Sequence, residues 1–140
     1  RQLTVGVFEN KVSKISSIFT GGKSAIDIWG INNSNELLVF ELKADNNEKV
    51  GIISELYFYV SVLQMLRTKI FKYENCLDEH KHLLEISETT RIKAYFLSPT
   101  LHPLVDKKIL ELLNEVRPDE INYHYIHFDK EYKLTLDNFN

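Results

Sequence analysis

Hydrophobic and polar residues alternate in several short stretches of this chain, and segments rich in turn-forming residues separate these stretches. Alternation with a period of two is typical of a strand with one buried face, and an unbroken apolar stretch indicates burial on both faces. The second pattern is clearest at Leu37-Leu38-Val39-Phe40. The predicted strands are 15–19, 25–31, 37–43, 91–97 and 121–128.

Two other segments show the helical spacing of apolar residues. The first is 49–66, and the second is 105–116, which ends before Pro118 because proline cannot continue a helix. Residues 67–90 are polar and charged, and we expect them to be helical only in part. The chain thus has strands followed by a helix, a strand, a helix and a last strand. This order predicts an α/β fold of three layers, α/β/α, in which the central layer is a mixed sheet.

The length and composition are those of a globular protein. A chain of 140 residues with 44% hydrophobic and 26% charged residues fits a single domain over 1–140. The chain begins with Arg1, so we expect a domain excised from a longer protein. A net charge of −3 argues against a strongly basic nucleic-acid-binding protein, and the lone Cys76 favours a reducing, cytoplasmic location. No apolar stretch is long enough to span a membrane.

Charged residues stand at the end of the most hydrophobic predicted strand. Glu41 and Lys43 are two positions apart, so they share one face, and we expect Leu42 between them to point into the core. A hairpin would place Asp27 of the preceding strand beside them. Unpaired buried charge is costly, and two arrangements relieve it. One is a site for a divalent cation, and the other is a plain Glu–Lys ion pair.

These residues carry a resemblance to a known family. Asp27, followed on the next strand by Glu41-Leu42-Lys43, resembles the signature of the PD-(D/E)XK nuclease superfamily. The predicted helix after it contains Glu55-Leu56-Tyr57-Phe58-Tyr59, which is similar to the Gln-Leu-x-x-Tyr motif of many members. The chain departs from the pattern in two places. Glu55 replaces the glutamine, and Ile26 precedes Asp27 where the family has a proline.

The resemblance implies a restriction-endonuclease-like fold and a nuclease that hydrolyses phosphodiester bonds in DNA, or in RNA. It implies that Mg²⁺ or Mn²⁺ binds to Asp27, Glu41 and the backbone carbonyl of Leu42, and that Lys43 orients water or stabilises the transition state. Glu55 is the further catalytic candidate. Many relatives work as dimers, so a homodimer or an additional domain is expected. The alternative is a non-catalytic module of the same fold that binds nucleic acid or a protein.

Other residues near the motif are candidates for contacts with nucleic acid. Lys23 and Ser24 follow two glycines that predict a tight turn, and Tyr59 lies one helical turn after Glu55. In the family a helix precedes the first strand, although residues 3–8 alternate as a strand does. Glu9 is either the acidic residue that many members carry on that helix or an ordinary surface residue.

Two further groups of residues have simpler interpretations. Cys76, His80 and His82 do not have the spacing of a common zinc site, so we interpret them as part of a solvated loop. His124 and His127 fall on opposite faces of the last predicted strand and cannot form a ligand pair. A small basic cluster, made of Arg67, Lys69 and Lys72, is expected to be a solvated helix end, with a contact to DNA as the alternative.

Overall fold

The computed structural model describes residues 3–5, 24–43, 50–71, 81–100, 102–131 and 133–137. Within these residues the chain forms strands and three helices in the order ββββααβαββ. The strands are β1 (Leu3–Val5), β2 (Ser24–Ile26), β3 (Ile28–Ile31), β4 (Leu37–Leu42), β5 (Ile92–Ser98), β6 (Ile121–Phe128) and β7 (Leu134–Asp137). The helices are α1 (Gly51–Arg67), α2 (Lys81–Ser87) and α3 (Lys107–Val116). No helix among the described residues has the length and apolar character that crossing a membrane requires.

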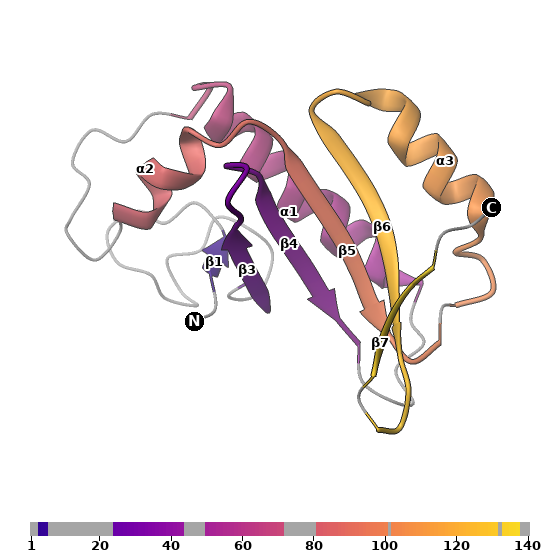
Figure 1. Cartoon of the computed structure of the whole chain (residues 1–140). Coiled ribbons are helices and arrows are strands. Elements are labelled where there is room, and N and C mark those ends of the chain that lie inside the picture. The colour runs from indigo at the N-terminus through magenta and orange to yellow at the C-terminus, as the bar shows by residue number, and fades with distance from the viewer. Residues whose placement is uncertain are drawn as a thin grey trace.

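The central sheet has five strands in the order β3-β4-β5-β6-β7 (Figure 1). Strands β4, β5 and β6 run parallel to one another, and the outer strands β3 and β7 pair antiparallel to their neighbours. Strands β1 and β2 form a separate antiparallel pair. The mixed sheet is therefore confirmed, and β4, which carries Glu41, lies inside it as the sequence predicts.

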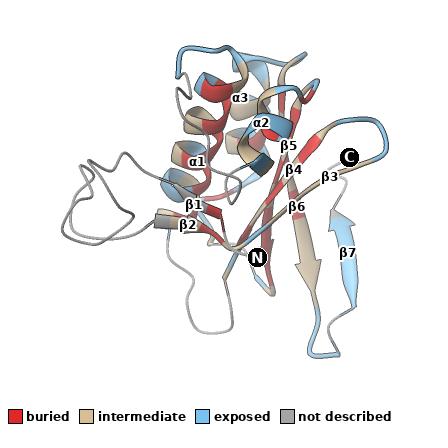
Figure 2. Ribbon diagram, turned by 90° about the vertical axis from the view of Figure 1, so that its left-hand side faces the viewer, coloured by how far each residue is buried: buried red, intermediate tan, exposed pale blue. Residues whose placement is uncertain are grey.

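The described helices cover one face of this sheet, as the side view in Figure 2 shows for α1 and α3. Alternate residues of the three parallel strands point toward them, and α2 in turn packs against α1. These inward residues, which belong to one buried cluster, are Leu37, Val39, Ile92, Ala94, Phe96, Ile121 and Tyr123. Helix α1 contributes Ile52, Leu56, Val60 and Leu63, whose spacing gives it a continuous apolar stripe.

The opposite face of the sheet is less buried. Leu38 and Phe40 are only half-buried, whereas Leu37 and Val39 are fully enclosed. The prediction that β4 is buried on both faces is therefore wrong for the described residues, because their helices all pack on the other side. A helical layer on this second face, which the three-layer arrangement requires, stays a prediction.

Several boundaries differ from the prediction. The strand predicted over 25–31 is broken into β2 and β3 by a bend at Asp27. Residues 3–5 form a strand, which agrees with their alternation, and α2 is a helix within 67–90, where a helical part was expected. The strand predicted over 15–19 lies outside the described residues. Strand β7 was not predicted, because its four residues are held by pairing with β6 rather than by burial.

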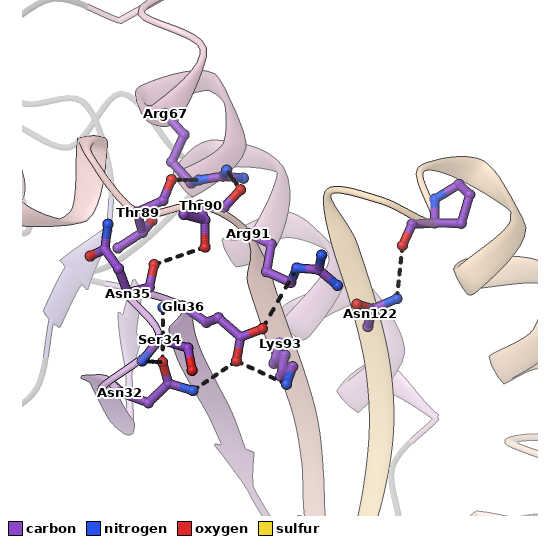
Figure 3. A network of polar contacts seen from close by, with 11 residues as sticks. Asn32, Ser34, Asn35, Glu36, Arg67, Thr89, Thr90, Arg91, Lys93 and Asn122 are labelled. Carbon is purple, nitrogen blue, oxygen red and sulfur yellow. Dashed lines mark hydrogen bonds and ion pairs between the residues drawn. The ribbon is translucent and has the colours of Figure 1, made fainter.

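Arg67 at the end of α1 is a structural residue rather than part of a solvated helix end. Its guanidinium donates to the carbonyl of Thr89 over 3.0 Å, to the carbonyl of Thr90, and to Oε1 of Gln64 over 2.6 Å. Figure 3 shows how this fork joins α1 to the segment that leads into β5. Lys69 pairs instead with Glu88 at 3.4 Å, and Lys72 lies outside the described residues.

We expect Arg67→Lys to lower the free energy of unfolding by about 1–3 kcal/mol, because a single ammonium nitrogen cannot reproduce the planar fork whose three nitrogens each reach a different acceptor. Urea denaturation measures this change. Arg117→Lys is the matched control, since Arg117 is half exposed and makes one 3.3 Å pair with Glu120. Equal losses of stability in the two variants would contradict the role given to Arg67.

Candidate functional site

Glu41 is a buried acidic residue near the carboxyl end of β4. Its position is 4% exposed, and it points to the same side as Val39, toward the helices. Leu42 is 38% exposed on the other side. The expectation that Leu42 points into the core is thus wrong. The alternation was correct, but the helices cover the face of Glu41, so the charged side chain is the buried one.

Lys43 joins two carboxylates from different elements. Its Nζ lies 2.8 Å from Oε1 of Glu41 and 2.5 Å from Oε2 of Glu55, which belongs to the second turn of α1. Burial by itself favours the neutral amine, but the hydrogen bonds to Glu41 and Glu55 outweigh it and raise the pKa of Lys43. Lys43 is therefore a fixed positive charge between β4 and the start of α1.

One oxygen of Glu41 has no partner among the described residues. Lys43 satisfies Oε1, whereas Oε2 is buried and accepts no hydrogen bond from them. The pKa of Glu41 is raised to about 7, first by burial and also by the neighbouring carboxyl of Glu55 and the charge of Asp27, while the hydrogen bond and charge of Lys43 act to lower it. Buried polar atoms are nearly always satisfied, so this oxygen is the atom of the cluster that a proton or a bound ligand could satisfy.

Asp27 reaches the same end of β4 from the neighbouring strand. The bend between β2 and β3 places it there, and its Oδ2 accepts a 3.2 Å hydrogen bond from the backbone N–H of Leu42. The influence of its charge on the pKa of Glu41 agrees with this proximity. The structure thus brings Asp27, Glu41 and Lys43 together at one end of the sheet, as the sequence predicts.

The donors at this point fit a hard divalent cation. Asp27 and Glu41 offer carboxylate oxygens, which Mg²⁺ and Mn²⁺ prefer, and the free Oε2 of Glu41 is the atom that a cation would satisfy. The described residues contain no group of three or more His, Cys, Asp or Glu side chains placed to hold a metal. A cation here would therefore depend on these two carboxylates together with the carbonyl of Leu42 and water.

Tyr59, Ser24, Lys23 and Glu9 are the remaining candidates from the sequence. Tyr59 is buried on α1, and its pKa is raised first by burial and then by the charges of Glu41, Glu55 and Asp27, so it lies beside the acidic cluster. Ser24 begins β2 opposite Val5. Lys23 and Glu9 lie outside the described residues.

The histidines do not gather into a site in the described part of the chain. His82 packs against Trp29 at 5.6 Å between ring centres, and His124 stacks on Tyr95. Cys76 and His80, the other members of the rejected zinc group, fall outside the described residues. His124 and His127 alternate along β6, as predicted.

Sequence reasoning missed the bridge that Lys43 makes to Glu55. A signal was present, since the family motif has a neutral glutamine where this chain has a second acid beside Glu41 and Lys43. An extra carboxylate next to a lysine favours an ion pair over a further metal ligand.

No protein-family model, no curated protein and no solved structure matches this chain.

Proposed function

We propose that this protein is a metal-dependent nuclease of the PD-(D/E)XK kind, with a restriction-endonuclease-like, three-layer fold, that hydrolyses phosphodiester bonds in DNA. The observation that carries the proposal is the buried Oε2 of Glu41, to which no described residue donates although Lys43 and Asp27 are adjacent. A plain Glu–Lys ion pair does not need this second oxygen to be buried. A bound cation gives it a ligand.

Asp27, Glu41 and the carbonyl of Leu42 would hold Mg²⁺ or Mn²⁺. Such a cation activates water and neutralises negative charge on phosphate oxygens. Lys43 would hold the attacking water or donate to the phosphate oxygen on which charge develops. Glu55 fixes Lys43 in place through their 2.5 Å contact, so its role is one of positioning. We further propose that the protein acts in the cytoplasm, as a homodimer or together with another domain.

The test is cleavage of supercoiled plasmid with Mg²⁺ or Mn²⁺, with and without chelator, and with single-stranded DNA and RNA as parallel substrates. Cleavage should need the cation, and it should rise as the pH passes about 7, because Glu41 binds a cation only when ionised. Cleavage that persists in chelator would contradict the proposal.

The second candidate is a non-catalytic module of the same fold that binds nucleic acid or a protein. One observation favours it. Lys43 is held by two carboxylates, and an ammonium so neutralised has less positive charge to offer a phosphate. If the wild type binds a partner but no cation-dependent cleavage of any nucleic acid is detected, this candidate replaces the first.

We expect Asp27→Asn to weaken the binding of Mn²⁺ by at least about tenfold, because cation affinity depends on the number of charged ligands. Asparagine keeps an oxygen that can accept the 3.2 Å bond from Leu42, so the fold should be retained. Calorimetric titration with Mn²⁺ measures the change. Asp106→Asn is the control, because Asp106 caps α3 and would keep its bond to the N–H of Ile109. Unchanged affinity in Asp27→Asn would remove Asp27 from the site.

A further inference from the structure

A pocket of about 240 Å³ lies between α1 and α3, with the beginning of β6 as its floor. Its walls are largely apolar. Met65 of α1 and Ile70 just after this helix face Leu113 and Val116 of α3, and Ile121 belongs to the floor. An engineered apolar cavity of about 150 Å³ in another protein takes up benzene. The pocket therefore has room for a ring with a substituent.

The walls of this pocket are held in place on both sides. The side chain of Asn114 on α3 accepts from the backbone N–H of Tyr123 over 2.6 Å and donates to its carbonyl over 3.1 Å, which fixes α3 to β6. The ring of Tyr123 stacks on that of Phe96, with the centres 6.3 Å apart. Arg67 ties the end of α1 to the segment before β5. The pocket is thus formed before any ligand enters, which lowers the cost of binding.

Tyr123 brings a buried hydroxyl to the pocket. The residue is 4% exposed, yet no hydrogen bond joins its hydroxyl to another described residue. Burial and then the neighbouring Tyr57, which also lines the pocket, raise the pKa of Tyr123, so the hydroxyl keeps its proton and can donate it. A buried tyrosine hydroxyl usually has a partner. It is therefore the group that a ligand in the pocket could satisfy.

Other polar side chains around the pocket already have partners within the protein. Ser61 and Thr68 each donate to a backbone carbonyl of α1, over 2.7 Å and 2.9 Å. The amide of Gln64 donates to Glu120, which also pairs with Arg117 at 3.3 Å. The charge of Arg117 is thus compensated. A buried anion would find no unpaired cation among the residues that line the pocket, so a neutral ligand is favoured.

We propose that this pocket binds a small, uncharged, planar ring that carries a carbonyl oxygen, and that the hydroxyls of Tyr123 and Tyr57 donate to this oxygen. The apolar walls would pack against the ring, and the few polar groups would orient it, as in most sites for small molecules. Asp27, Glu41 and Lys43 do not line the pocket. The inference is therefore independent of the proposed nuclease activity.

The experiment is a titration of the ¹⁵N-labelled protein with benzamide, followed by the chemical shifts of its backbone amides. Saturable shifts are expected at Leu113, Val116 and Tyr123. Benzoate, which has nearly the same shape and a negative charge, and ethylbenzene, which lacks the oxygen, should both bind more weakly. Tyr123→Phe should weaken the binding of benzamide by about fivefold, the effect of losing one neutral hydrogen bond, and leave that of ethylbenzene unchanged. Tyr95→Phe is the matched control, because Tyr95 is half-buried on the opposite face of the sheet.

Val116→Trp provides a second test, because a large ring at this 66% exposed position would fill the pocket without disturbing the core. It should abolish the binding of benzamide, and it replaces Tyr123→Phe if the spectrum of that variant shows unfolding. Three results would overturn the proposal: no saturable shifts in the wild type, equal affinity of the wild type and Tyr123→Phe, or binding that persists in Val116→Trp. Benzoate binding as tightly as benzamide would contradict the neutral ligand. A wild-type dimer that Val116→Trp dissociates, without any binding of benzamide, would assign the pocket to a second copy of the chain instead.

Discussion

Replacing Lys43 with alanine is expected to reduce cation-dependent cleavage by at least about 100-fold, the usual cost of removing one preorganised donor from a transition state. The structure places Nζ of Lys43 within 2.8 Å of Glu41, so the lost charge is at the proposed reaction centre. The reduction should appear in kcat, with substrate binding little changed, because Lys43 is assigned to the transition state. Plasmid cleavage under single-turnover conditions measures it.

The competing interpretation is that Lys43 is structural. In that case Lys43→Ala would lower the melting temperature while the rate per folded molecule stayed the same. Measuring both quantities on one preparation separates the two. Lys69→Ala is the matched control, because Lys69 is 69% exposed and its only described partner is Glu88. Its cleavage rate and melting temperature should equal those of the wild type.

The arrangement of Asp27, Glu41 and Lys43 could be predicted because it depends on short-range rules. The alternation along β4 puts Glu41 and Lys43 on one face, and the asparagine-rich turn before β4 makes β3 its antiparallel neighbour. The helical period of α1 likewise placed Leu56 and Tyr59 toward the sheet. Each of these inferences needs only neighbouring residues and the geometry of one element.

The side on which the helices pack could not be predicted in this way. Both crossovers, from β4 to β5 and from β5 to β6, connect parallel neighbours in the same direction along the sheet, so their helices share a face. Strand order is a property of the whole sheet, and no local pattern contains it. This is why Leu42 was expected inside, and why the stacking of His124 on Tyr95 was missed. These two residues are far apart in sequence and become neighbours only through the register.

Glu41 is expected to make the stability of this protein fall as the pH rises from about 4.5 to about 7. Its pKa is raised from 4.5 to about 7 in the folded state, so between these values the folded protein holds a proton that the unfolded chain has lost. The unfolded state then binds fewer protons, and the free energy of unfolding decreases with increasing pH. The stabilisation is complete below pH 4.5 and is lost above pH 7. A shift of this size corresponds to about 3 kcal/mol.

Glu41→Gln should remove this dependence, because glutamine has nearly the same shape and no proton to lose. Urea denaturation between pH 4 and 8 gives one curve of the free energy of unfolding against pH for the wild type and one for the variant. The difference between the two curves should change across this pH range, and that change is the contribution of Glu41. Glu111→Gln should follow the wild type, since its side chain is 56% exposed on α3. Parallel curves for wild type and Glu41→Gln would show that burial does not perturb Glu41 in this way.

A divalent cation connects the stability of Glu41 with its proposed function. A ligand that binds only the folded protein with Glu41 ionised stabilises that form by mass action. Mn²⁺ should therefore raise the free energy of unfolding of the wild type above pH 7 and cancel part of the loss that Glu41 causes. It should do little at pH 5, where Glu41 is protonated, and little at any pH in Glu41→Gln. Equal stabilisation of both proteins by Mn²⁺ at pH 8 would mean that the cation binds elsewhere, and that the unpartnered oxygen of Glu41 is not its ligand.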